Sequence, residues 1–206
     1  MRKEREFLIR IRRFDPEKGE GPPYVQEYCL SLNQGSTVLD ALIMIKESID
    51  STLTFRRSCR SAICGSCAVR VNNKAVLACN TRLEEVAKDR EPIVIEPLRN
   101  LRVIKDLVVD MEIFVERLKK GQPWLITAGY RLPLNKEYLV YPDEKYQWLN
   151  KVDNCTLCGI CYSDCPVLAK EPSFIGPPAV VKARRFLLDI RDMVHNGRCQ
   201  QLLELG

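Results

Sequence analysis

The sequence predicts an α+β fold in two parts, a strand-rich part followed by a helical part. Apolar and polar residues alternate repeatedly before residue 100, as in half-buried strands, whereas apolar residues recur at helical spacing after it. The ten cysteines of the 206-residue chain support this division, because four lie at 59–79, four lie at 155–165 and two stand alone. We therefore expect domains at 1–100 and 136–206, joined by a helical link and connector at 101–135.

Two strands are expected near the N-terminus. Ile9 and Ile11 alternate with arginines, and the run 28–32 repeats this period of two. Cys29 lies inside the second run, and we interpret it as a small buried residue, because unpaired cysteines behave as small hydrophobes.

A hairpin and a last strand are expected further along the first domain. Ala68–Val71 and Lys74–Leu77 flank Asn72-Asn73, a pair that tolerates the left-handed backbone of a tight turn. Ile93–Ile95 lies between two prolines and is typical of a short strand. Strands of this kind around one helix predict a small β-grasp-like domain.

Three helices are expected. The segment 37–40 has a capping-box pattern and opens a helix whose apolar stripe extends over 38–49. Helical spacing of apolar residues predicts an amphipathic helix over 103–119. The prolines in 176–178 precede a helix expected from about 179 to 192, because proline suits a first helical turn.

Composition excludes several classes of function. The net charge of +5 comes from 32 basic and 27 acidic residues, which is too mild for a nucleic-acid binder. The charged N-terminus lacks the apolar core of a signal peptide, and no run of 18 apolar residues occurs, so we expect a cytoplasmic chain that does not span a membrane. His195 is the only histidine, whereas a Rieske centre needs two.

The first cysteine group has the spacing of plant-type 2Fe–2S proteins. It reads Cys59-x4-Cys64-x2-Cys67, with Cys79 after eleven further residues. Small residues around Gly65 would let backbone N–H groups approach the sulfurs, and nearby arginines would ease the negative charge of a reduced cluster. A structural zinc site is the alternative, but zinc sites usually show paired C-x2–4-C knuckles.

The second group is a bacterial-ferredoxin run, C-x2-C-x2-C-x3-C-P, formed by Cys155, Cys158, Cys161, Cys165 and Pro166. In such runs the first three cysteines bind one 4Fe–4S cluster, and the fourth binds a different cluster. Both clusters then need further ligands. Only Cys199 lies downstream, and we interpret it as a non-ligand, so we expect the chain to be short at its C-terminus.

This order of motifs resembles the iron–sulfur subunit of succinate dehydrogenase and fumarate reductase. The likeness covers essentially the whole chain, and further stretches carry it at 58–67, 103–111, 174–177 and 185–192. The family's downstream cysteine motif is absent, and Lys170 stands near the place of its quinone-pocket tryptophan.

The resemblance implies a role in electron transfer with no catalytic residue on this chain. Electrons would pass between an FAD-containing flavoprotein, which interconverts succinate and fumarate, and a quinone beside a membrane anchor. Residue by residue, the resemblance assigns a 2Fe–2S cluster to Cys59, Cys64, Cys67 and Cys79, a 4Fe–4S cluster to Cys155, Cys158 and Cys161, a 3Fe–4S cluster or second cubane to Cys165, and the quinone pocket to Pro166. The expected location is the inner face of the cell membrane, reached through partners.

Two other functions stay open from the sequence. One is a two-domain ferredoxin-like subunit feeding a different oxidoreductase, such as a glycolate-oxidase-like or heterodisulfide-reductase-like system. The other is a zinc-stabilised interaction protein.

Overall fold

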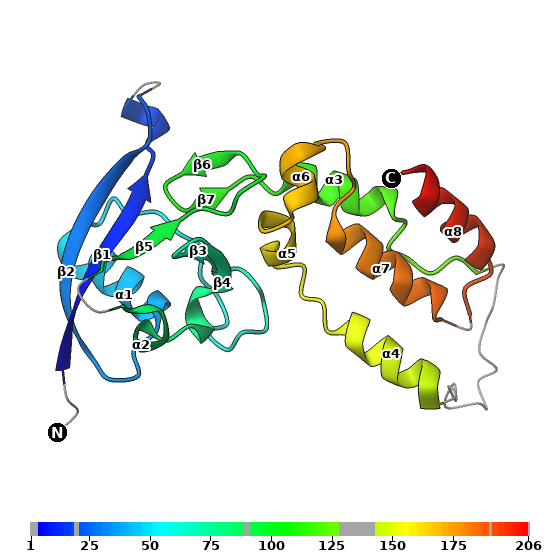
Figure 1. The fold of residues 1–206 in the computed structure, drawn as a ribbon, viewed down its shortest axis with the longest axis horizontal. Coiled ribbons are helices and arrows are strands. Elements are labelled where there is room, and N and C mark those ends of the chain that lie inside the picture. Colours follow the sequence, from blue (N-terminus) through cyan, green and yellow to red (C-terminus); the bar gives the residue numbers. More distant parts are fainter. Residues whose placement is uncertain (1–3, 19–20, 89–90, 128–142, 190, 206) are drawn as a thin grey trace. The chain divides into compact units, whose positions relative to one another are not determined.

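The computed structural model describes residues 4–18, 21–88, 91–127, 143–189 and 191–205. The chain forms two compact units, and both are interrupted in sequence (Figure 1). The first unit contains Met1–Met111 and Cys158–Asp164, and the second contains Glu112–Leu157 and Cys165–Gly206. A short piece of the second cysteine motif therefore folds with the strand-rich unit.

A five-stranded mixed sheet is the framework of the first unit. Its strands lie in the order β2-β1-β5-β3-β4, where β1 is Glu4–Arg13, β2 is Tyr24–Asn33, β3 is Ala68–Val71, β4 is Lys74–Leu77 and β5 is Ile93–Glu96. β1 pairs antiparallel with β2 and parallel with β5, and β3 pairs antiparallel with both β4 and β5. The predicted hairpin is confirmed, because Asn72 and Asn73 adopt φ values of 46° and 69° between β3 and β4.

Strand alternation builds the core and corrects one expectation. Ile9, Ile11, Tyr28 and Leu30 are buried in the main core cluster. Cys29 is exposed, so the prediction that it is buried was wrong. Successive side chains of a strand point to opposite faces, and the buried neighbours of Cys29 place it on the face away from that core.

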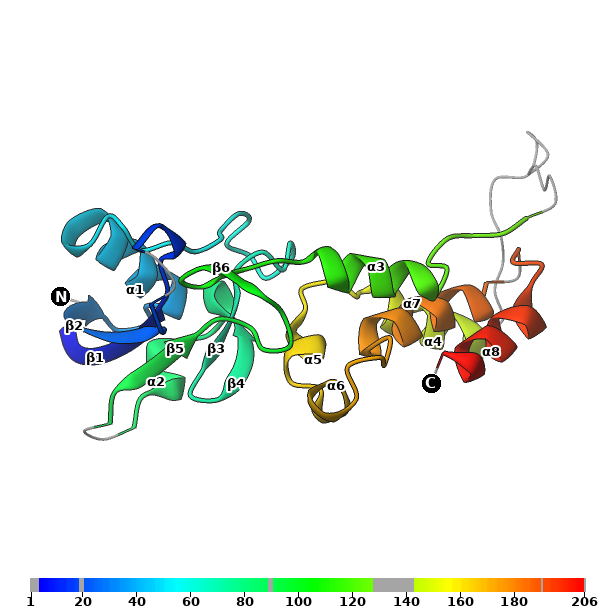
Figure 2. The same ribbon diagram turned by 90° about the horizontal axis from the view of Figure 1, so that it is seen from above.

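Helix α1 (Val38–Met44) contributes the other side of this core, and Figure 2 shows it beside the sheet. Its predicted capping box is confirmed, since the Thr37 backbone N–H donates to Asp40 Oδ2 at 2.8 Å and the Asp40 N–H donates to Thr37 Oγ1 at 3.2 Å. A wider helical turn, Ile45–Ile49, continues α1, and its last residue is exposed. Two short turns complete this region, Ala78–Asn80 and α2 (Leu83–Val86), and another, Pro16–Lys18, follows β1.

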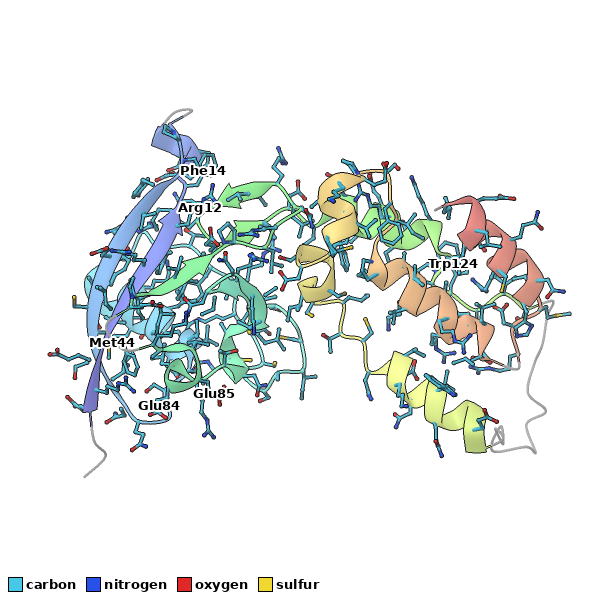
Figure 3. The ribbon with its side chains drawn as sticks, in the orientation of Figure 1. Arg12, Phe14, Met44, Glu84, Glu85 and Trp124 are labelled. Carbon is cyan, nitrogen blue, oxygen red and sulfur yellow. The ribbon has the colours of Figure 1, made fainter. Side chains whose placement is uncertain are left out.

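The helix predicted over 103–119 was wrong in its first half. Strands β6 (Val103–Lys105) and β7 (Val108–Val109) form a small antiparallel ribbon, and α3 (Glu112–Lys120) begins only after it. Asp106 decides the turn between the two strands, with φ of 47°. Its backbone N–H donates to the carbonyl of Phe14, the residue that follows β1 and is labelled in Figure 3. Its carboxylate accepts the Phe14 N–H. These tertiary contacts override the local helical spacing.

A buried ionic network ties the end of β1 to two distant segments. Arg13 donates to Asp106 Oδ1 at 2.8 Å, to Asp50 Oδ2 at 2.6 Å and to Tyr28 Oη at 2.8 Å. Burial acts to raise the pKa of Asp50, but hydrogen bonds from Thr52, Arg13 and Tyr28 outweigh it and hold that pKa well below its ordinary value. The folded state therefore favours the ionised form of Asp50.

The Asp50→Asn variant is expected to be less stable than the parent chain by about 2 kcal/mol at pH 7, because it loses hydrogen bonds to a charged group. Asp50 has a lowered pKa in the folded state, so its stabilisation is complete above the unfolded pKa of about 3.9 and is lost as the pH falls below it. Urea unfolding of both chains at pH 7, 5 and 3 measures this difference. We expect it to be equal at pH 7 and 5 and smaller at pH 3, and a difference that grew at pH 3 would contradict the assignment.

Helices form the second unit. They are α3, α4 (Asp143–Asp153), α6 (Pro166–Lys170), α7 (Pro177–Leu187) and α8 (His195–Glu204), with α3, α4 and α8 each in contact with α7. α7 begins at Pro177, slightly before the expected start near residue 179, and ends at Leu187, so the predicted end near residue 192 was wrong. The chain turns there because Asp189 accepts bonds from the Arg191 side chain and backbone N–H. The Arg191 hydrogen bond outweighs burial and lowers the pKa of Asp189.

Candidate functional site

The first four candidate cysteines lie at the open end of the β3–β4 hairpin and in the loop that precedes it. Cys67 comes directly before β3, and Cys79 lies in the turn directly after β4. The Cys79 N–H donates to Cys67 Sγ at 3.4 Å, and the Ala78 N–H donates to the Cys67 carbonyl at 3.1 Å. Strand pairing therefore brings together two cysteines that are separated by 12 positions in sequence.

Backbone N–H groups point at all four sulfurs. Cys59 Sγ accepts from Ser61 and Cys64 at 3.4 and 3.3 Å, and Cys64 Sγ accepts from Ser66 at 3.5 Å. Cys79 Sγ accepts from Ala62 at 3.3 Å, a bond that joins the loop to the hairpin. Hydrogen bonds of this kind to ligand sulfurs tune the reduction potential of iron–sulfur clusters.

The loop needs unusual backbone angles to present these groups. Arg60, Ala62 and Gly65 have φ values of 58°, 56° and 72°. Left-handed angles are uncommon for residues other than glycine, and such strain gathers at functional sites. The small residues that the sequence showed around Gly65 therefore serve a loop that curls around the sulfurs.

The thiols lie in different environments. Hydrogen bonds, first from the Ser66 side chain and then from Cys59, lower the pKa of the exposed Cys64 thiol to about 6. Burial raises the pKa of the Cys67 thiol to about 11. Because metals bind the thiolate, ligation at Cys67 must overcome this desolvation. The expected arginines are present, and Arg56, Arg57 and Arg60 are all exposed beside the loop.

These residues fit an iron–sulfur cluster. The four sulfurs are paired with inward-pointing N–H groups that can stabilise a group of net negative charge. In the described part of the chain, no three Cys, His, Asp or Glu side chains are arranged to hold a single metal ion.

The second cysteine motif is divided between the two units. Cys158 and Cys161 belong to the first unit, where Cys161 lies in α5 (Ile160–Ser163). Cys155 and Cys165 belong to the second unit, and Cys165 directly precedes α6, whose first residue is the exposed Pro166. Lys182 Nζ donates to the Cys155 carbonyl at 3.1 Å. The predicted non-ligand Cys199 lies exposed in α8.

Sequence reasoning missed two residues near these motifs. Asp164, the residue before Cys165, forms an ion pair with the buried Arg70 of β3. The position of Asp164 between two cysteines of the motif was the only sequence feature that could have indicated its role. No sequence feature indicated a role for Arg70.

Comparison with known proteins identifies the family. Residues 8–116 match the family described as 2Fe-2S iron-sulfur cluster binding domain. The chain is 39% identical over 186 residues to the fumarate reductase iron-sulfur subunit of Mycobacterium tuberculosis (strain CDC 1551 / Oshkosh), which covers 90% of this chain and 74% of that protein. The chain belongs to the family of fumarate reductase iron–sulfur subunits.

Solved structures support the fold of this iron–sulfur subunit. The Mycobacterium smegmatis Sdh1 complex in the apo form matches with a TM-score of 0.78 and 23% identity, over 97% of this chain and 82% of that one. A hypothetical protein from Helicobacter pylori matches with a TM-score of 0.54 and 16% identity, over 97% of this chain and 32% of that one. The predicted α+β fold is confirmed.

The family membership also confirms the predicted role. The chain is an electron-transfer subunit of an oxidoreductase, and its cofactors are iron–sulfur clusters. Within the described ranges, none of the helices has both the length and the apolar character needed to span a bilayer.

Proposed function

We propose that this iron–sulfur subunit moves single electrons between an FAD-containing flavoprotein, which interconverts succinate and fumarate, and a membrane quinone. Cys59, Cys64, Cys67 and Cys79 hold a 2Fe–2S cluster in this proposal. Cys155, Cys158 and Cys161 supply three ligands of a 4Fe–4S cluster, and Cys165 supplies one ligand of a 3Fe–4S cluster or second cubane. The observation that carries the proposal is the set of backbone N–H groups that point at all four sulfurs of the first site.

The chain's own groups suit one-electron chemistry. An iron–sulfur cluster supplies a redox centre that gains one negative charge on reduction. The N–H groups of Ser61, Ala62, Ser66 and Cys79 are fixed before that charge arrives, so little reorganisation is needed to stabilise it. The exposed arginines beside the loop act in the same direction.

The remaining assignments follow the family. The partners are the flavoprotein and a membrane anchor, and the location is the cytoplasmic face of the cell membrane, reached through that anchor. Pro166 is assigned to the quinone pocket on its place in the motif, and its side chain is accessible. The functional domains are proposed at 1–100 and 136–206, with 101–135 as link.

Electron paramagnetic resonance tests the first site. The purified complex is expected to give a rhombic 2Fe–2S signal after mild reduction and to contain both iron and acid-labile sulfide. Full iron loading without that signal would contradict the 2Fe–2S assignment. Zinc without labile sulfide would instead favour a structural metal site.

A further inference from the structure

Part of the second cysteine motif is built into the first unit. The Tyr162 side chain is fully buried there, and the Tyr162 carbonyl accepts from Asn100 Nδ2 at 3.0 Å. Ser163 Oγ accepts the backbone N–H of Arg99 at 2.9 Å. Gly159 has φ of 81°, and an added Cβ would lie 3.3 Å from Leu98 Cδ1, so this backbone packs closely against the residues after β5. The segment 158–164 is therefore held by backbone, side chain and packing contacts.

Asp164 extends this attachment to the β3–β4 hairpin. Its carboxylate accepts from Arg70 Nη1 and, at 2.9 Å, from the Ala75 backbone N–H. Arg70 and Ala75 are directly opposite each other in the hairpin. The Asp164 carboxylate therefore accepts one hydrogen bond from β3 and one from β4, and so links the two strands.

The buried Arg70 side chain needs a partner of opposite charge. The Arg70 side chain is 3% exposed and that of Asp164 is 38% exposed. Arg70 Nη2 donates to the Asn73 carbonyl, but Nε is buried with no hydrogen-bond partner among the described residues. A buried guanidinium with an incomplete set of acceptors depends on its carboxylate partner. Removal of the Asp164 charge would leave this cation uncompensated.

The hairpin joins the two motifs. Its open end carries Cys67 before β3 and Cys79 after β4, both proposed 2Fe–2S ligands. Its cross-strand pair holds Asp164, which is three residues after Cys161, a proposed ligand of the 4Fe–4S cluster. The β3–β4 hairpin therefore lies next to proposed ligands of both clusters. This matters because the rate of electron transfer falls steeply with the distance between two redox centres.

We propose that Arg70 and Asp164 are positioning residues that hold Cys158 and Cys161 against the hairpin carrying Cys67 and Cys79, and so fix these two proposed ligands relative to the first cluster. This inference rests on the proposed function. It goes beyond that function because neither residue is a proposed cluster ligand.

The test uses Asp164→Asn and the charge-conserving Arg70→Lys in the purified complex. Iron, labile sulfide and the g values of the 2Fe–2S signal are measured first, to show that the clusters are present. The magnetic relaxation of that signal is then measured with the second cluster reduced, because this coupling depends directly on the distance between clusters. A role confined to general stability would not change it.

We expect Asp164→Asn to keep both clusters but to weaken the relaxation enhancement several-fold. We expect kcat to fall at unchanged KM, because electrons would have to cross a longer gap to the second cluster. Arg70→Lys should show a smaller change in the same direction. Arg102→Gln removes the exposed Arg102–Asp110 pair and serves as the matched control with no expected change.

Wild-type relaxation and kcat in both variants would overturn the proposal. If Asp164→Asn loses iron, Arg70→Lys is judged by the same measurements, and unchanged coupling there overturns it equally. Absence of a 2Fe–2S signal in the parent complex would instead contradict the proposed function, so the two failures are distinguishable.

Discussion

Replacing Cys67 by alanine is expected to abolish the 2Fe–2S signal of the purified complex. The Cys67 side chain is buried, and its sulfur lies against the Cys79 N–H at the base of the hairpin. A cluster of this type needs four thiolates, two for each iron, and no other cysteine lies in the β3–β4 hairpin to replace the lost one. The variant should lose about two iron atoms and about two labile sulfides per chain.

Cys29→Ala is the matched control for this experiment. Cys29 is exposed in β2 and takes no part in the sulfur–amide contacts of the loop. Iron content and the signal should match those of the parent chain. A Cys67→Ala variant with full signal intensity would remove the cysteine from the ligand set, and loss of signal in both variants would point to general unfolding.

Replacing Asp106 by alanine is expected to lower the free energy of unfolding by about 3–5 kcal/mol, because it breaks a buried ion pair. Asp106 Oδ1 accepts from Arg13 and from the Phe14 N–H, and Oδ2 accepts the Thr54 N–H at 2.9 Å. Its side chain is completely buried. The substitution therefore leaves one cation short of a partner and two backbone donors unsatisfied, each of which costs free energy.

Urea unfolding of the purified chain, followed by circular dichroism, measures this effect. Glu27→Gln is the control, because the Arg10–Glu27 pair is about half exposed and such surface pairs contribute at most about 1 kcal/mol. A loss below that value in Asp106→Ala would show that the ribbon β6–β7 does not depend on this carboxylate. Thr54 lies shortly before Cys59, so the signal of the first cluster should also weaken in the variant.

The features that sequence reasoning predicted correctly depend on contacts between near neighbours. Thr37 and Asp40 cap α1 from within one turn, and Asn72-Asn73 closes a two-residue hairpin between adjacent strands. The cysteine spacing can also be interpreted from the sequence, because a short loop must present several sulfurs to one iron–sulfur cluster. The family that these motifs resembled is the family to which the chain belongs.

The errors arose where distant residues decide local structure. Helical spacing over 103–119 was real, but Asp106 is bound by Arg13, 93 positions away, and the resulting turn replaces the first half of the helix. The end of α7 was overestimated for a similar reason, since Asp189 satisfies Arg185 and Arg191 at the turn. The prediction that Cys29 is buried was wrong because the alternation of side chains along β2, and not the residue type, determines which face of the sheet it lies on.

The sequence alone determined the α+β class and the family, and it predicted the first cysteine site, because spacing and alternation are properties of neighbouring residues. Only the tertiary structure decided that Cys158–Asp164 folds with the strand-rich unit. It also paired Arg70 with Asp164 across 94 positions. The physical reason is that a buried charge must find its partner in space, and no local pattern specifies which distant residue supplies it.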